Sequence, residues 1–153
     1  MAVNVPEVVV IDDNDHQTVL KIVGFFNAAT SSNTKIQANT FKGANTSITP
    51  CLVGVVNILY STSFSNGSIA LEYVSTVNTN TRIAQVGRCN DGELNKYVPN
   101  NANTPSGDMN INIANAGAND SFTMYVTCLK EMQGAYWAFN AGAGAWANTQ
   151  VGY

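Results

Sequence analysis

Charge is what this sequence has least of. Lys, Arg, Asp and Glu supply only 11% of its 153 residues, less than half the roughly 25% of an average globular domain. The formal net charge of -3 at pH 7 gives weak repulsion between copies, so we expect a chain that tolerates or seeks association. Its seven basic residues are scattered along the chain. A phosphate backbone needs a basic patch, so we expect no nucleic-acid partner.

Residues that hold metals or act as nucleophiles are also scarce. His16 is the single histidine, which excludes the usual multi-histidine zinc sites. Cys51, Cys89 and Cys128 are odd in number and far apart, so we interpret them as small hydrophobic side chains rather than disulfides or metal ligands. Neither a G-x-S-x-G turn nor a phosphate-binding glycine loop occurs. We therefore expect no enzyme and no cofactor.

Two catalytic alternatives stay open in principle. His16 could act with a serine or cysteine, although no motif surrounds it. A carboxylate pair for glycoside chemistry could come from four acidic residues that the sequence cannot bring together: Glu72, Asp91, Glu93 and Asp108.

Long apolar runs are missing as well. No stretch of about 18 apolar residues occurs, so we expect no membrane span. The N-terminal sequence MAVNVPEVVVIDD lacks the basic and apolar regions of a secretory signal. We expect synthesis and folding in a cytoplasm.

What the sequence does contain is period-2 alternation of apolar and polar residues. We predict strands over residues 5–12, 17–26, 34–41, 51–64, 68–77, 81–87, 107–117 and 120–132. No segment has a convincing helical period. The prediction is an all-β antiparallel sandwich, Ig-like or jelly-roll-like, of about seven or eight strands. The sandwich domain would cover residues 1–132, and residues 133–153 would form a C-terminal extended arm.

Turn residues predict the connections. The sequence DNDH, residues 13–16, favours a hairpin turn, and Asn66 with Gly67 favours a second tight turn with positive φ angles. Closely spaced oxygens at Asp12–Asp15 could also hold calcium, although the EF-hand pattern is incomplete, and we predict no metal site. Residues 88–107 are Asn-rich and contain Pro99 and Pro105, which predicts a long polar loop of the kind that is often functional.

Aromatic residues concentrate outside the predicted strands. The segment 134–153 has no charged side chain, so its aromatic residues are candidate contacts with a neighbouring protein. The alternatives are that the segment covers its own domain or that tryptophan stacks on sugar rings. The candidate interface residues are Tyr136, Trp137, Phe139, Trp146 and Tyr153, and the candidate loop contacts are Tyr97, Asn100 and Asn101.

Three stretches give the chain a resemblance to a known class of proteins. They are VVVIDDNDHQTVLKIVGFFN, NILYSTSFSNGSIALEYVS and SGDMNINIANAGANDSFTMYVTCLKEM, and they resemble small β-sandwich virion structural proteins of tailed bacteriophages. The resemblance implies a non-enzymatic capsid decoration (cement) subunit in the virion. Its implied partners are other copies of itself and the major capsid protein or another virion subunit.

A second hypothesis is a carbohydrate- or receptor-binding module of a phage tail or fibre. It would use the predicted loop at residues 88–107 and nearby aromatic side chains such as Tyr97 and Trp137.

Overall fold

The computed structural model describes residues 3–44 and 51–130, and these form seven strands and one short 3-10 helix. The strands are β1 (Glu7–Asp13), β2 (Gln17–Phe25), β3 (Thr30–Ile36), β4 (Val53–Ser75), β5 (Thr81–Leu94), β6 (Pro105–Ala116) and β7 (Ser121–Lys130), and the 3-10 helix η1 is Ala38–Thr40. Every strand pair is antiparallel. The predicted all-β antiparallel fold is confirmed, while the predicted arm and its boundary lie outside the described residues.

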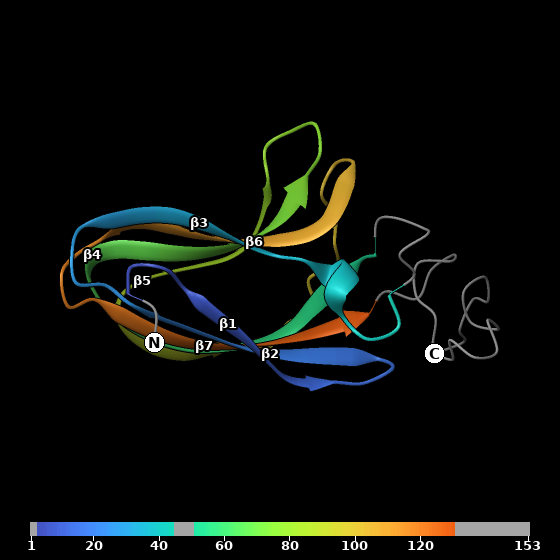
Figure 1. Ribbon diagram of the computed structural model, residues 1–153, viewed down its shortest axis with the longest axis horizontal. Coiled ribbons are helices and arrows are strands. Elements are labelled where there is room, and N and C mark those ends of the chain that lie inside the picture. Colours follow the sequence, from blue (N-terminus) through green and yellow to red (C-terminus); the bar gives the residue numbers. More distant parts are fainter. Residues whose placement is uncertain (1–2, 45–50, 131–153) are drawn as a thin grey trace.

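The strands form two facing layers that share β4 and β5 (Figure 1). Residues 53–62 of β4 pair with β7, whereas residues 68–75 pair with β6. β5 follows β4 through both halves. One layer therefore has the order β1-β2-β7-β4-β5, and the other has the order β3-β6-β4-β5. The long β4–β5 hairpin bends from the first layer into the second.

The bend lies at residues 64–67 of β4. Ser63 pairs with Cys89 and Ser68 pairs with Gly87, so four residues of β4 face Arg88 alone, which has a φ of 55°. A β-bulge of this kind bends a strand and increases its twist. A Cβ on Gly67 would lie 2.7 Å from the carbonyl oxygen of Asn115, so glycine is required for β6 to approach this closely.

The predicted tight turn at Asn66 and Gly67 is wrong, because these residues lie inside β4. The chain reverses instead between Ser75 and Thr81. There the Ser75 hydroxyl accepts a hydrogen bond from the amide of Asn78 at 2.9 Å. Gly67, which predicted a turn, instead allows β6 to approach β4 closely.

Two further boundaries differ from the prediction. β3 begins at Thr30 and ends at Ile36, and residues 38–40, predicted as strand, form η1. β5 continues to Leu94 through residues predicted as loop, which shortens the loop to residues 95–104. Polar and charged side chains suit an edge strand because its surroundings are aqueous. The expected apolar alternation is therefore absent there.

The core lies between the layers. Phe26, Phe64 and Phe122 pack at one end with ring centroids 6.0 to 6.4 Å apart. Tyr73 is fully buried and its hydroxyl accepts from the amide of Val55 at 2.8 Å, which satisfies its polar group. Cys51 and Cys128 are buried free thiols, as predicted. Burial raises the pKa of Cys128 to about 12, so this thiol stays protonated.

A buried lysine ties the end of β7 to the β1–β2 turn. Lys130 has a fully buried side chain, and its Nζ donates to Asp13 Oδ1 at 2.8 Å and to the carbonyl oxygens of Asn14 at 2.6 Å and Lys42 at 2.5 Å. Asn14 Oδ1 accepts from the amides of His16 and Gln17. The turn predicted at residues 13–16 is confirmed, together with its side-chain bonding to nearby backbone.

No helix in the described ranges is both long and apolar enough to span a bilayer.

Candidate functional site

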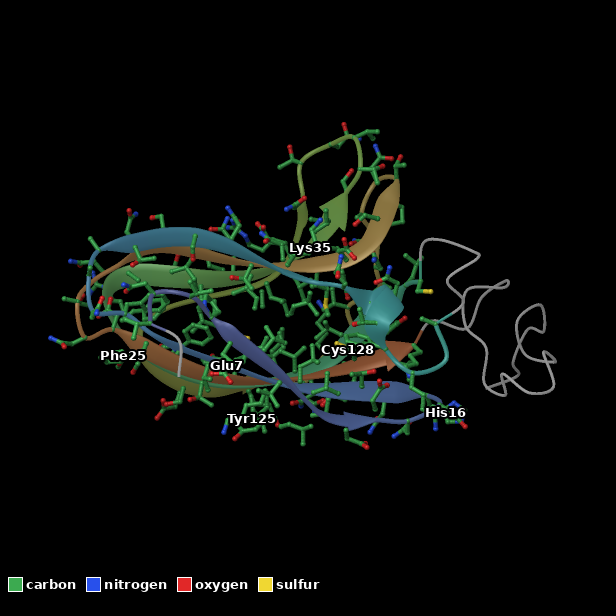
Figure 2. All side chains as sticks on the ribbon, in the orientation of Figure 1. Glu7, His16, Phe25, Lys35, Tyr125 and Cys128 are labelled. Carbon is green, nitrogen blue, oxygen red and sulfur yellow. The ribbon has the colours of Figure 1, made fainter. Side chains whose placement is uncertain are left out.

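A transverse row of side chains crosses the outer face of the first layer. Cross-strand partners on adjacent strands stand side by side with alternate residues facing outward. The strand registers align one residue from each of five strands, in the order Val9, Lys21, Tyr125, Leu59 and Glu93. Figure 2 shows Tyr125 on the outer side of this layer and Cys128 between the layers.

A second row runs beside the first. Thr123 pairs with Ser61, and Ser61 pairs with Asp91. The two rows enclose an open groove of about 560 Å³ over β7, β4 and β5. Its walls are Leu59, Ser61, Asp91, Glu93, Thr123 and Tyr125, with Tyr60 and Gly92 beside them.

The middle of the groove is apolar and solvent-exposed. Tyr125 is 38% exposed and Leu59 is 46% exposed, and they are direct partners on β7 and β4. Lys21 Nζ lies 5.9 Å from the Tyr125 ring centroid, within cation–π range. Large apolar side chains that stay exposed side by side are candidates for a binding surface.

The β5 side of the groove is acidic. Asp91 Oδ1 accepts a hydrogen bond from Ser61 Oγ at 2.6 Å, and Glu93 Oε2 accepts from Asn57 Nδ2 at 3.2 Å. Within the described ranges, neither carboxylate forms a salt bridge. Each carboxylate has two oxygens, so acceptor capacity remains for a ligand.

Gly92 makes room for Tyr60 at the sheet edge. A Cβ on Gly92 would lie 2.5 Å from Tyr60 Oη, so a larger residue here would displace the Tyr60 ring from its position against the edge strand. Tyr60 and Glu93 also line a second hollow of about 260 Å³ beside Ile83, Gln85 and Leu94. The two hollows therefore meet at Tyr60.

The acidic residues named as catalytic alternatives separate into two groups. Glu72 lies 3.8 Å from Arg82 and Asp108 lies 3.6 Å from Lys35 in ion pairs, whereas Asp91 and Glu93 share the groove. His16 lies in the β1–β2 turn, and the described side chains that line the groove include neither histidine nor cysteine.

The acidic turn at Asp12–Asp15 is held by hydrogen bonds and ion pairs. Asp13 bonds Lys130, and Asp15 lies 3.2 Å from Lys42. In the part of the chain that the structure describes, no three His, Cys, Asp or Glu side chains come together to hold a metal ion.

The loop residues predicted as contacts do not line the groove. Tyr97 is exposed, and Asn100 Oδ1 accepts from the amide of Ala102 at 3.2 Å. Asn101 lies in the same loop, exposed to solvent. The predicted interface residues Tyr136, Trp137, Phe139, Trp146 and Tyr153 lie outside the described residues.

Leu59 and Tyr125 were not among the sequence candidates, because aromatic residues outside the predicted strands are densest in the loop and the C-terminal segment. Asp91 and Glu93 were named only as members of a possible carboxylate pair.

The alternation of β7 carried a usable signal. In this strand Phe122, Met124 and Val126 alternate with polar residues or Tyr125, so the three share one face and Tyr125 lies on the opposite face. A tyrosine at an outward position between threonines is the residue that this pattern singles out.

No protein-family model and no curated protein matches this sequence. Two solved structures are remotely similar in shape. One is TmCBM61 in complex with β-1,4-galactotriose, with a TM-score of 0.34, 10% identity and coverage of 82% of this chain and 69% of that chain. The other is the N-terminal endo-1,4-β-D-xylanase 10B of Clostridium thermocellum, its CBM22-1 and GH10 modules complexed with xylohexaose, with a TM-score of 0.38, 10% identity and coverage of 86% and 25%. Similarities this remote assign neither a family nor a ligand to this chain.

Proposed function

We propose that this protein is a non-enzymatic β-sandwich module that binds carbohydrate in the groove on its outer face. The observation that carries the proposal is the pairing of an exposed apolar centre, Tyr125 and Leu59, with the carboxylates of Asp91 and Glu93. This is the second of the two hypotheses drawn from the sequence, with the binding site placed on the sheet rather than in the loop.

The chemistry of the groove suits a sugar. A pyranose ring has apolar C–H faces that pack on an aromatic ring, and its hydroxyl groups need acceptors at the side. Hydroxyl groups that donate to a carboxylate make charge-assisted bonds, which are roughly twice as strong as neutral ones. A mostly apolar surface with a few placed polar groups is the usual composition of a small-ligand site.

The charges of the groove select among sugars. Asp91 and Glu93 lie on one side, and Lys21 lies over Tyr125. A uronic acid whose carboxylate lay on the β5 side would stand near like charges, and such juxtaposition is unfavourable. We therefore propose a neutral polysaccharide as ligand.

A glycan array tests the proposal. The full chain is applied to neutral, amino and acidic glycans, with β-1,4-galactotriose and xylohexaose among the soluble competitors. We expect binding to neutral glycans that falls at least about 5-fold in Tyr125→Ala, since truncating an anchoring aromatic residue costs more than about 1 kcal/mol.

Tyr97→Ala is the matched control, because Tyr97 is an exposed tyrosine outside the groove. Equal loss in both variants, or loss only in Tyr97→Ala, would move the site to the loop and overturn the groove assignment.

A place in a bacteriophage virion stays a prediction that rests on the sequence resemblance. Its proposed contact residues lie outside the described part of the chain. A carbohydrate-binding module on a phage tail or fibre would satisfy both the resemblance and the groove, and detection of the protein in purified particles is the measurement that would establish it.

A further inference from the structure

β1 forms a free edge of the first layer. Of the strands that the structure describes, β1 pairs with β2 alone. The other side of β1 therefore carries backbone donors and acceptors without strand partners. Such an edge is a template for another extended segment.

This edge is also apolar. Val9, Val10 and Ile11 are consecutive and are 43%, 47% and 52% exposed. The pairing register shifts between Val10 and Asp12, so Ile11 sits in an irregularity of the ladder. Edge strands are usually protected by central charges or proline, whereas here the charged residues of β1, Glu7, Asp12 and Asp13, stand only near its two ends.

The described chain ends in β7, at the same end of the layer as the β1–β2 turn, and β2 lies between β7 and β1. The amide of Lys130 donates to the carbonyl oxygen of His16 at 2.8 Å, and its Nζ is 2.8 Å from Asp13 Oδ1. Asp13 is the last residue of β1. The described part of the chain therefore ends with only β2 between it and the Asp13 end of β1.

The remaining chain has the length and chemistry to cover the edge. Residues 131–153 could span up to roughly 75 Å when extended, compared with roughly 23 Å for the seven residues of β1. Residues 134–153 carry no charged side chain and include Trp137, Phe139 and Trp146. An uncharged aromatic segment matches the uncharged apolar middle of β1.

We propose that residues 134–153 dock along the free edge of β1 in the same chain and cover Val9, Val10 and Ile11. Backbone pairing at a sheet edge supplies affinity, and alternate side chains supply specificity. Attachment through Lys130 makes the contact intramolecular, with an effective concentration in the millimolar range for a short linker. Residues 134–153 of a neighbouring copy would compete for the same edge, but at a lower effective concentration. This inference does not depend on the carbohydrate groove.

Tryptophan fluorescence tests the contact in the full chain. Trp137 and Trp146 are the only tryptophans of the protein, so its tryptophan emission reports on this segment alone. We expect emission at shorter wavelength than that of the urea-unfolded chain. The double variant Val9→Glu/Ile11→Glu should shift the emission toward the unfolded value, because carboxylates on the edge would be buried by docking.

Val77→Glu is the matched control, since Val77 is 67% exposed in the β4–β5 connection, away from β1. It should leave the emission unchanged. Emission of the β1 double variant identical to that of the wild type would overturn the proposal.

Hydrogen exchange provides a second measurement that does not alter the sandwich. Trp137→Ala/Trp146→Ala changes only the C-terminal segment, and it should speed amide exchange in residues 7–13. Unchanged exchange there would overturn the proposal.

Light scattering distinguishes docking within one chain from docking between copies. A monomer whose tryptophan emission does not change on dilution supports docking within one chain. An oligomer whose emission changes on dilution assigns the edge to a neighbouring copy and overturns the proposal.

Discussion

At the scale of single residues, the proposed function depends on which side chains a strand places on its outer face. Tyr125 follows one buried residue of β7 and precedes another, so its position on the outer face is a consequence of strand geometry. Asp91 and Glu93 are two residues apart on β5, and therefore they face the same side. The groove is thus built from the period-2 geometry of three neighbouring strands.

The acidic side of the groove gives a prediction at this scale. Asp91→Asn and Glu93→Gln should each weaken glycan binding by about 10-fold, because a hydrogen bond to a charged group contributes about 1.5–3 kcal/mol. Titration calorimetry with the best glycan of the array would measure the loss. Asp108→Asn is the control, since Asp108 pairs with Lys35 on β3 and lies outside the groove. Full affinity in both groove variants would contradict a role for the carboxylates.

At the scale of elements, the bend of β4 joins the two layers. The amide of Ser65 donates to Asp120 Oδ1 at 3.1 Å, and Asp120 Oδ2 accepts from the amide of Gly117 at 2.6 Å. The buried Asp120 therefore holds the β6–β7 connection against the bend.

A methyl group at the bend should be costly. Gly67→Ala would place its Cβ 2.7 to 2.8 Å from three backbone atoms of β6, which cannot rotate away, so we expect a loss of about 3 kcal/mol in unfolding free energy. Gly117→Ala is the control, because its nearest contact is the Ser65 hydroxyl at 3.2 Å. Urea denaturation measures both, and equal stability of the two variants would contradict the close-approach explanation for Gly67.

The link between β7 and the β1–β2 turn predicts a pH dependence. Burial alone would raise the pKa of Asp13, but hydrogen bonds from Lys130, the Lys42 amide and Thr18, together with the charge of Lys130, lower that pKa below its usual 3.8. A lowered pKa in the folded state means that this stabilisation is present above the unfolded-state value and is lost as the pH falls through the folded-state value.

We therefore expect the unfolding free energy of the wild type to decrease below about pH 4. Asp13→Asn should lower the unfolding free energy at neutral pH, because it leaves Lys130 buried without its carboxylate. The unfolding free energy of this variant should also decrease less than that of the wild type as the pH falls. Asp15→Asn, in the same turn but in a surface ion pair with Lys42, should change stability by less than about 1 kcal/mol. The same acid decrease in Asp13→Asn as in the wild type would contradict the account.

The elements also show what the sequence could predict. β2 and β7 alternate regularly because one face is buried, and their predicted ranges agree closely with the structure. The turn predicted at Asn66 and Gly67 was wrong, because the local sequence does not distinguish a turn glycine from a glycine that a neighbouring strand requires for close approach. The polar half of β5 was predicted as a loop, so the sequence did not place Asp91 and Glu93 on one face of a strand. Cross-strand neighbours of the groove depend on register, which a single strand's pattern does not contain.

At the scale of the whole molecule, the two features for which we propose binding lie in separate places. The groove occupies the β7-β4-β5 part of the first layer, whereas the apolar free edge belongs to β1 at the other side of that layer. A ligand in the groove and a segment docked on β1 can therefore be present together. The low charge of the surface leaves both contacts to packing and hydrogen bonds.

The most direct test of the carbohydrate groove is amide chemical-shift mapping of the full chain with a glycan that it binds. The account predicts that the largest shift changes cluster at residues 59–61, 91–93 and 123–125, the three strand segments that line the groove. Changes confined to residues 95–104, or no saturable change with any neutral, amino or acidic glycan, would contradict it.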